Sequence, residues 1–420
     1  MYKAPRGTFD ILPAEQGYWS YISQKALDIC KAYGYKRLDT PAFENASLFV
    51  RSIGEDTDIV EKEMYSFEDR SKEKLTLRPE GTAPVCRAYI EHGMHSLPQP
   101  VRLYYFADIF RYERPQAGRY RQHHQFGVEA LGDNDPALDA EVIEMAWQLY
   151  ANLGLSGLSL YLNSIGCSNC RPTYLGSLQD YYSKHVESLC QDCKRRLKLN
   201  PMRLLDCKKS SCIPLTENAP KSADYLCREC TSHLRQLQEL LEVLNLPYIM
   251  EHRLVRGLDY YTRTVFEIAP EDETAAQATI GAGGRYDNLI EQLGGKPTPA
   301  VGFATGIERI VLNLKKQKVE IPAISAPSVF IAYLGRKAKN EAIKLSSTLR
   351  KAGLSVTLSY GDRSFKAQLK QANTAGILHA VIMGEDEIKS GTLILRNMDR
   401  GEQETLPRDQ AIEALCRACS

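Results

Sequence analysis

Three arginines lie in segments whose composition suits the binding of phosphate. Arg111 opens the loop of a predicted hairpin, Arg256 begins the run Arg-Gly-Leu-Asp-Tyr-Tyr, and Arg309 falls in the first turns of a predicted helix. The guanidinium group presents a planar fork of donors that matches phosphate oxygens. A cation near a helix N-terminus opposes the helix dipole, and an anionic ligand bound there would remove the conflict. Each segment alone also fits a solvated, charged loop, so the hypothesis of a phosphate site depends on their combination.

Carboxylates and an amide accompany the arginines. Gln125 and Glu129 share one face of the strand that returns from the hairpin loop, because side chains alternate along a strand. Glu80 and Thr82 stand at a predicted strand-to-helix turn, where Thr82 is expected to cap the helix. These polar side chains could hold a polar substrate along a sheet. An ordinary capped helix start is the alternative at Glu80 and Thr82.

Two glycine-containing segments add phenols and a carboxylate. Asp259, Tyr260 and Tyr261 follow Arg256 just before a predicted strand. The run Ile-Gly-Ala-Gly-Gly-Arg-Tyr-Asp, which contains Tyr286, is expected either to let the backbone approach a ligand or to form a plain flexible turn. Its glycines are in the wrong order for a dinucleotide fingerprint, and no strand–helix–strand unit with an acidic residue follows. We therefore reject a dinucleotide site.

Cysteine is concentrated in one part of the chain, since eight of the 12 lie between residues 167 and 230. The first two pairs are separated by 19 residues and match the spacing of a zinc site built from two C-x2-C pairs. Four pairs could form two tetrahedral sites of four thiolates, which suit zinc, and reduced buried thiols are the alternative. The four pairs are Cys167 and Cys170, Cys190 and Cys193, Cys207 and Cys212, and Cys227 and Cys230.

The composition is that of an ordinary globular chain. Of 420 residues, 43% are hydrophobic and 25% are charged, which excludes a mainly disordered or fibrous protein. No apolar run approaches the roughly 18 residues of a membrane span, and the N-terminus shows no signal peptide. We therefore expect a cytoplasmic protein with no membrane contact. The net charge of +1 neither predicts nor excludes a nucleic-acid partner.

The segments around these residues predict an α+β fold with an antiparallel sheet. Apolar periodicity predicts helices over 15–33 and 139–153, and hairpins over 64–78 and 101–131. Strands are expected at 36–40, 265–268 and 300–303. The cysteine-rich residues 165–248 are predicted to form a small domain inserted in a domain that spans 1–322. Residues 327–420 alternate strand and helix, which predicts a C-terminal α/β domain with a mostly parallel sheet.

Taken together and in this order, the segments closely resemble the histidyl-tRNA synthetases, a family of class II aminoacyl-tRNA synthetases. Residues 37–41 resemble the first class motif, which builds a dimer interface around a proline. Residues 110–129, with Phe-Arg-Tyr-Glu-Arg-Pro at their start, resemble the second motif, and residues 302–309 the third. Residues 256–261 and 282–287 resemble two signatures of the histidine enzymes. The C-terminal α/β segment is similar to the family's anticodon-binding domain.

The resemblance implies a two-step reaction, in which ATP activates L-histidine to histidyl-adenylate and the adenylate then acylates the 3′ end of tRNA(His). It implies that Arg111 and Arg256 bind the α-phosphate and that Arg309 binds the γ-phosphate, all three counting as catalytic. Glu113 and Arg119 would also contact ATP, which arrives with magnesium. A homodimer is implied as well.

The same resemblance assigns the histidine site. Residues expected to orient the amino and carboxylate groups are Glu80, Thr82, Gln125 and Asp259, and residues expected around the imidazole are Glu129, Tyr261 and Tyr286. Tyr260 is also expected to bind histidine. Two other functions remain as alternatives. A regulatory paralogue of the ATP phosphoribosyltransferase type would generally lack the C-terminal domain, and a zinc-dependent nucleic-acid-binding module would leave the arginines unexplained. Basic residues of the insertion could face RNA or solvent, namely Lys194, Arg195, Arg196, Lys198, Lys208 and Lys209.

Overall fold

The computed structural model describes residues 2–54, 57–113, 118–271, 279–322 and 327–419. Within them the chain divides into two units, Met1–Pro322 and Ala323–Ser420. No helix in these described residues is long and apolar enough to cross a membrane.

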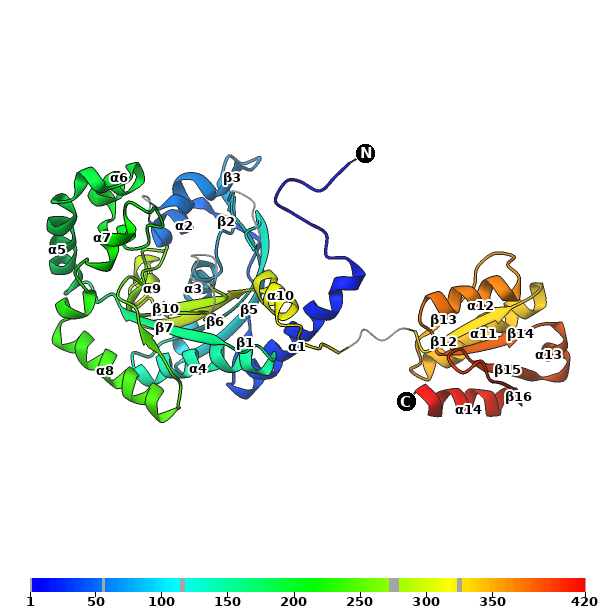
Figure 1. Cartoon of the computed structure of the whole chain (residues 1–420). Coiled ribbons are helices and arrows are strands. Elements are labelled where there is room, and N and C mark those ends of the chain that lie inside the picture. The colour runs from blue at the N-terminus through cyan, green and yellow to red at the C-terminus, as the bar shows by residue number, and fades with distance from the viewer. Residues whose placement is uncertain (1, 55–56, 114–117, 272–278, 323–326, 420) are drawn as a thin grey trace. The chain divides into compact units, whose positions relative to one another are not determined.

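An eight-stranded sheet forms the centre of the first unit (Figure 1). Its central strands are antiparallel, and only the short strands at the two edges pair in parallel. The predicted hairpin over 101–131 forms two of its strands. In spatial order the strands are β1 (Lys36–Arg37), β5 (Val101–Phe110), β6 (Gln122–Leu131), β11 (Ala300–Gly306), β10 (Gly281–Arg285), β9 (Thr262–Pro270), β7 (Leu158–Ser164) and β8 (Ile249–Met250).

Helices cover both faces of this sheet. On one face lie α1 (Gln16–Ala32), α4 (Pro136–Asn152) and α10 (Ile307–Lys316), which bury apolar side chains against Phe126 and Val128 of β6. On the other face lie α3 (Thr82–Glu91) and α9 (Leu289–Gln292), which pack against Tyr105 of β5. Since successive side chains of a strand point to opposite faces, one strand serves both layers. Polar side chains on the face covered by α3 and α9 form part of the candidate site.

A small antiparallel sheet stands beside α3. It is ordered β2 (Phe43–Asn45), β4 (Lys74–Leu77) and β3 (Tyr65–Glu68), and the β3–β4 hairpin was predicted from the sequence. Between β2 and β3 lie α2 (Ala46–Ile53) and the single turn η2 (Ile59–Glu63). The predicted strand over 36–40 is shorter in the structure, because only β1 pairs with the sheet.

The cysteine-rich segment between β7 and β8 is helical. Its long helix α8 (Arg228–Val243) packs on α4 and buries Leu234, Leu237 and Leu241. The elements before α8 are short and contain no strand among the described residues. They are α5 (Arg171–Ser183), η4 (Val186–Ser188), α6 (Gln191–Leu199), η5 (Pro201–Leu204), α7 (Ile213–Glu217) and η6 (Ser222–Tyr225).

The second unit is a five-stranded sheet between helices. In order, it contains β13 (Val356–Leu358), β12 (Val329–Tyr333), β14 (His379–Met383), β15 (Thr392–Asn397) and β16 (Gln403–Pro407). The first three strands are parallel, as predicted, whereas β15 and β16 are antiparallel and were not predicted. The helices are α11 (Arg336–Lys351), α12 (Phe365–Thr374), α13 (Glu385–Ser390) and α14 (Arg408–Cys419).

The glycine-rich run from 281 to 285 is a buried central strand, so the expectation of a flexible turn is wrong. A Cβ atom at Gly283 would lie 2.2 Å from the backbone oxygen of Gly302 and 2.7 Å from the ring of Phe266. Glycine is therefore required here by the close approach of β11 and β9. The sequence signal was misleading because glycine is depleted in ordinary strands.

Candidate active site

A cavity of about 270 Å³ opens above β6, β9, β10 and β11. Its floor contains small residues of the central strands, Gly281, Ala282 and Ala304, which leave room above the backbone. Charged side chains surround the floor, and most of them come from outside the sheet's core. These are Arg111, Glu113, Arg119, Arg256, Glu267, Glu308 and Arg309.

The three arginines singled out in the sequence line this one cavity. Arg111 follows β5 and donates from Nε to the carbonyl oxygen of Pro79 at 2.7 Å. Arg256 precedes β9 and forms an ion pair with Glu267. Arg309 is the third residue of α10 and donates to the carbonyl oxygen of Thr279. Three segments distant in the sequence thus direct guanidinium groups to the same space.

The electrostatics of the cavity favour an anion. Burial, together with the nearby Arg119 guanidinium, lowers the pKa of Arg309. The Nε atom of Arg256 is buried and has no hydrogen-bond acceptor among the described residues. In the described part of the hairpin loop, Arg119 forms an ion pair with Glu113 at 3.1 Å. A bound phosphate would supply acceptors to these guanidinium groups and offset their mutual repulsion.

His123 also lines the cavity, although the sequence analysis did not assign it to the site. Burial, with the positive charges of Arg111 and Arg309, lowers its pKa to about 3. The ring is therefore neutral at neutral pH. The next residue, His124, donates its backbone N–H to Glu308 at 2.9 Å, which ties β6 to α10 beneath the cavity. The place of His123 in the site could have been predicted, because His123 lies on the same strand as Gln125 and two residues before it.

Beside the cavity, Glu129 is the centre of a buried hydrogen-bonded cluster. It accepts from the Thr82 hydroxyl at 2.7 Å and from the Tyr286 phenol, and Tyr105 lies 3.5 Å away. Only 1% of Glu129 is exposed, and burial raises its pKa to about 8. Gly127 makes room for this arrangement, because a Cβ there would lie 2.4 Å from the Tyr105 ring. Gln125, on the same face of β6, reaches the cavity itself.

Glu80, not Thr82, caps helix α3. The Glu80 carboxylate accepts from the backbone N–H of Thr82 at 2.6 Å and of Ala83 at 2.8 Å. The predicted capping role of Thr82 is therefore wrong, since its hydroxyl is turned to Glu129. Burial raises the pKa of Glu80, and the Tyr260 phenol lies 3.4 Å from it. The structure thus joins Glu80, Thr82 and Tyr260 to the cluster around Glu129.

Asp259 lies in a second cavity, of about 230 Å³, between the sheet and the insertion. This cavity shares Arg256 with the first and is also lined by Tyr261, whose ring centroid lies 5.9 Å from the Arg256 guanidinium carbon. Asp259 accepts a hydrogen bond of 2.8 Å from the Asn200 side chain of the insertion. Asp259 is thus held next to the insertion, on the far side of Arg256.

Basic residues of the insertion contact the rest of the first unit. Arg196 pairs with Asp58 at 2.9 Å, and Arg195 pairs with Glu61 at 2.9 Å. Arg203 also reaches Asp58, at 3.4 Å. Two of the six basic residues that could face RNA or solvent, Arg195 and Arg196, therefore form ion pairs that hold helix α6 against η2.

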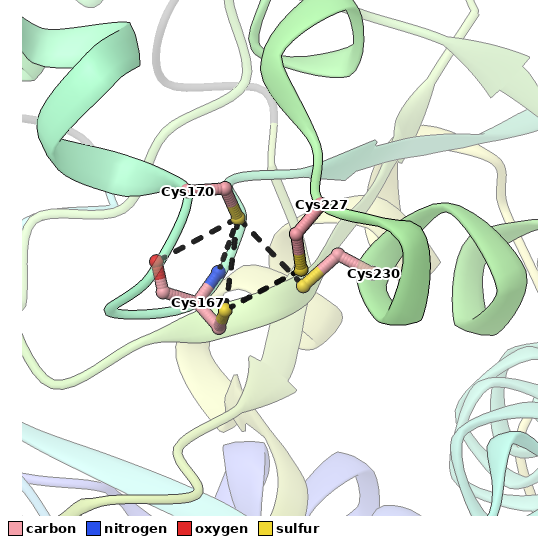
Figure 2. Close-up of side chains that lie close together, drawn as sticks. All are labelled: Cys167, Cys170, Cys227 and Cys230. Carbon is pink, nitrogen blue, oxygen red and sulfur yellow. Dashed lines mark hydrogen bonds between the residues drawn. The ribbon is translucent and has the colours of Figure 1, made fainter.

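The eight clustered cysteines form two groups, one from the first and last pairs of the sequence and one from the two pairs between them. Cys167 and Cys170 meet the last pair, Cys227 and Cys230 (Figure 2). The second group contains Cys190, Cys193, Cys207 and Cys212. The first two pairs therefore belong to different groups, although their spacing matched a single zinc pattern. The groups are nested, with the second one inside the segment that the first one closes.

Comparisons with known proteins point to one family. The family model described as Histidyl-tRNA synthetase matches residues 7–170 and 186–310, and the one described as Anticodon binding domain matches residues 328–417. The chain belongs to the histidyl-tRNA synthetase family. This confirms the resemblance of the motifs and the α+β fold with its C-terminal α/β domain.

Individual members of the family match over nearly the whole chain. The chain is 61% identical over 412 residues to the histidine--tRNA ligase of Dehalococcoides mccartyi, covering 98% of each. It is 50% identical over 411 residues to that of Pelotomaculum thermopropionicum, covering 98% of this chain and 96% of the relative. The crystal structure of apo S. aureus histidyl-tRNA synthetase matches with a TM-score of 0.84 at 37% identity, covering 99% of this chain and all of that one. Such full-length similarity does not favour a regulatory paralogue.

Proposed function

We propose that this aminoacyl-tRNA synthetase, a histidine–tRNA ligase by its family, performs both steps of its reaction at the cavity lined by the three arginines. In the first step the carboxylate of L-histidine attacks the α-phosphorus of ATP and releases pyrophosphate. In the second, the 3′-terminal ribose of tRNA(His) takes the histidyl group from the adenylate. The single observation that carries this proposal is the convergence of Arg111, Arg256 and Arg309 beside the buried cluster around Glu129.

The arginines act on charge and position. Arg111 and Arg256 both line the cavity and would hold the α-phosphate between them, where negative charge grows as the carboxylate oxygen attacks. Arg309, Glu113 and Arg119 line the part of the cavity nearest the hairpin loop and would bind the rest of the ATP–magnesium complex. Held in line, the two substrates need no covalent participation by the protein.

The cluster around Glu129 would recognise the imidazole. Histidine is the amino acid whose ring offers both a donor and an acceptor, and Glu129, Tyr261 and Tyr286 supply complementary groups. Glu80, Thr82, Gln125, Tyr260 and Asp259 would orient the amino and carboxylate groups of the substrate. A pocket that leaves its buried polar groups unpaired with the wrong amino acid can discriminate by about 10⁴ or more, so no editing step is needed.

The remaining parts have roles that follow from the family. We assign residues 1–322 to catalysis, with 165–248 as an insertion near the acceptor end of tRNA, and residues 327–420 to the anticodon. A homodimer in the cytoplasm is also part of the proposal. Phe43 and Phe67, 51% and 44% exposed on the small sheet, give that dimer an apolar contact close to the first class motif.

Exchange of pyrophosphate into ATP, measured with each of the twenty amino acids and without tRNA, tests the proposal. We expect exchange with histidine alone. Folded protein that gave no exchange with any amino acid would contradict it, whereas exchange with a different amino acid would contradict only the assignment of the pocket.

A matched pair of arginine variants tests the site. Arg256→Ala should abolish histidine-dependent exchange, because it removes one of the two guanidinium groups that would hold the α-phosphate in the cavity. Arg253→Ala is the control, since Arg253 lies three residues away and pairs only with Glu251 and Glu217 among the ion pairs described. Full exchange by the Arg256 variant would remove this residue from the mechanism.

A further inference from the structure

Each of the two cysteine groups gathers four sulfur atoms into a volume suited to a single metal ion. Within each group, all four Sγ atoms lie within 4.8 Å of one another. In the outer group, Cys167 Sγ lies 3.7 Å from Cys170 Sγ and 3.8 Å from Cys227 Sγ, and Cys170 Sγ lies 3.8 Å from Cys230 Sγ. In the inner group, Cys190 Sγ and Cys207 Sγ are 3.9 Å apart. Figure 2 shows the outer four side chains turned toward a common centre.

These separations match a tetrahedral thiolate site. With a zinc–sulfur bond of about 2.3 Å, the edge of a regular tetrahedron of sulfur atoms is about 3.8 Å. Disulfides would require sulfur atoms about 2.05 Å apart, so the groups are not pairs of disulfides. The cysteines that bind a cubane iron–sulfur cluster each bind a different iron, which spreads their sulfur atoms farther apart than these. The spacing therefore points to one ion in each group.

We propose that the insertion contains two structural zinc ions, an outer one bound by Cys167, Cys170, Cys227 and Cys230 and an inner one bound by Cys190, Cys193, Cys207 and Cys212. Four thiolates complete the coordination of zinc and leave no position for a substrate. Both ions are therefore structural and take no part in adenylate formation.

The local backbone supports thiolates at both positions. The backbone N–H of Cys167 points to Cys170 Sγ at 3.1 Å, and that of Cys190 points to Cys212 Sγ at 3.3 Å. Donors of this kind stabilise negative charge on sulfur and orient metal ligands. Five of the eight cysteines are also buried, which shields the coordinated sulfur from solvent and oxidants.

The fold of the insertion explains why it needs metal. Between residues 190 and 212 the chain forms only the nine-residue α6 and the four-residue η5. Such short elements bury too little apolar area to be stable alone, and small domains of this kind are commonly held by metals or disulfides. The inner ion would fix η5. Arg203 of η5 contacts Asp58, and Asn200, the residue before η5, donates to Asp259.

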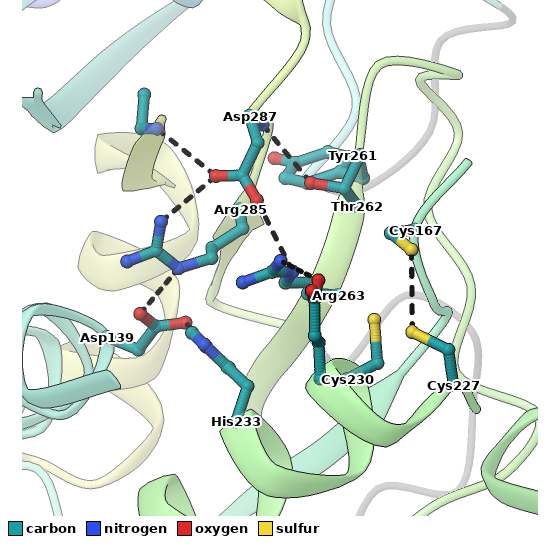
Figure 3. Close-up of polar contacts among 12 residues, drawn as sticks. Asp139, Cys167, Cys227, Cys230, His233, Tyr261, Thr262, Arg263, Arg285 and Asp287 are labelled. Carbon is teal, nitrogen blue, oxygen red and sulfur yellow. Dashed lines mark hydrogen bonds and ion pairs between the residues drawn. The ribbon is translucent and has the colours of Figure 1, made fainter. Parts of the chain in front are cut away.

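The outer ion lies at the base of the insertion, next to a buried ionic network (Figure 3). Helix α8 begins at Arg228, between two ligands, and its His233 lies 3.2 Å from Asp139 of α4. Asp139 in turn accepts from Arg285 of β10 at 2.7 Å. The network joins Arg285 of β10 to the helix that the outer ion anchors, so this ion helps to hold α8 in place against the sheet.

Metal analysis of the purified full-length chain tests the proposal directly. Protein made without a metal-binding tag and dialysed without chelator should contain about two zinc ions per chain by mass spectrometry. Replacement of the zinc by cobalt(II) should give the intense visible absorption of tetrahedral cobalt bound to four thiolates. Protein with no bound metal would overturn the proposal, and so would protein whose metal is iron.

Double variants test which cysteines share an ion. Cys167→Ser with Cys227→Ser should lose about one zinc, because both residues belong to the outer site, whereas Cys167→Ser with Cys190→Ser should lose about two. Pairing in sequence order would give the opposite result for the two variants and would overturn the assignment of ligands. Cys416→Ser with Cys419→Ser lies outside both groups and should keep both ions. If the serine variants fail to fold, the zinc content and the cobalt spectrum of the unaltered chain still decide whether the two sites exist.

Discussion

Replacing Glu129 with glutamine separates what this residue contributes to histidine binding from what its burial does to stability. Burial raises its pKa from an ordinary 4.5 to about 8. Between these values the folded chain keeps a proton that the unfolded chain releases, so the wild type becomes less stable as the pH rises from about 4.5 through 8. At about 1.4 kcal/mol for each pKa unit, the loss between pH 5 and pH 8 amounts to roughly 3 kcal/mol.

The Glu129→Gln variant cannot lose a proton and should lack this dependence. We expect its free energy of unfolding, measured with urea at pH 5 and at pH 8, to change by roughly 3 kcal/mol less than that of the wild type over the same range. Glu291→Gln changes an exposed carboxylate of α9 and is the control. Parallel pH dependences of the wild type and Glu129→Gln would refute the conclusion that Glu129 is protonated in the folded chain at neutral pH.

The same variant should bind histidine poorly. A hydrogen bond between neutral groups contributes about 0.5–1.5 kcal/mol, so kcat/KM for histidine in the exchange assay should fall by roughly 2- to 10-fold. The KM for ATP should stay the same, because Glu129 does not line the phosphate cavity. An unchanged KM for histidine would exclude Glu129 from the imidazole pocket.

Three further changes have clear expected outcomes. Gly283→Ala should lower the free energy of unfolding by about 3 kcal/mol or more, because its Cβ would lie 2.2 Å from a backbone oxygen, whereas Gly176→Ala, with open space in α5, should be neutral or stabilising. Thr82→Val removes the donor 2.7 Å from Glu129 and should lower stability by about 1–3 kcal/mol in thermal unfolding while raising the KM for histidine. His123→Gln should be as stable as the wild type at pH 7.5 and more stable than it at pH 5, measured by urea denaturation. The reason is that the lowered pKa of His123, about 3, makes the wild type less stable as the pH falls below 6.5. Equal stability of the two proteins at pH 5 would contradict this.

Local sequence patterns predicted much of the framework. The alternation of side chains from 122 to 131 placed Gln125 and Glu129 on one face, and the hairpin formed with that register. At the end of β10, Arg285 and Tyr286 turn to different partners, since Tyr286 donates to Glu129. Arg285 points to α4 and pairs with Asp139, although it belongs to a signature of the histidine enzymes.

Features that depend on packing between distant segments could not be predicted. The buried strand β10 is built from residues that disfavour strands, and its glycines are explained by crowding from other segments, such as Phe266 and Gly302 against Gly283. The pairing of the cysteines and the placement of Asp259 beside Asn200 are likewise set by how the insertion folds back on the sheet. A rule based on local spacing cannot predict such contacts, and for the cysteines it favoured a combination of the first two pairs that does not form.

The insertion leaves and rejoins the rest of the first unit at almost one point. Cys167 and Cys227 are 60 residues apart in the chain, yet their sulfur atoms are 3.8 Å apart. The 59 residues between them thus form a loop whose two ends lie close together. The entropy of closing such a loop grows only slowly with its length. Changes in the length of this segment, away from its contacts with Asp58, Glu61 and Asp259, therefore cost little free energy and leave the register of the sheet unchanged.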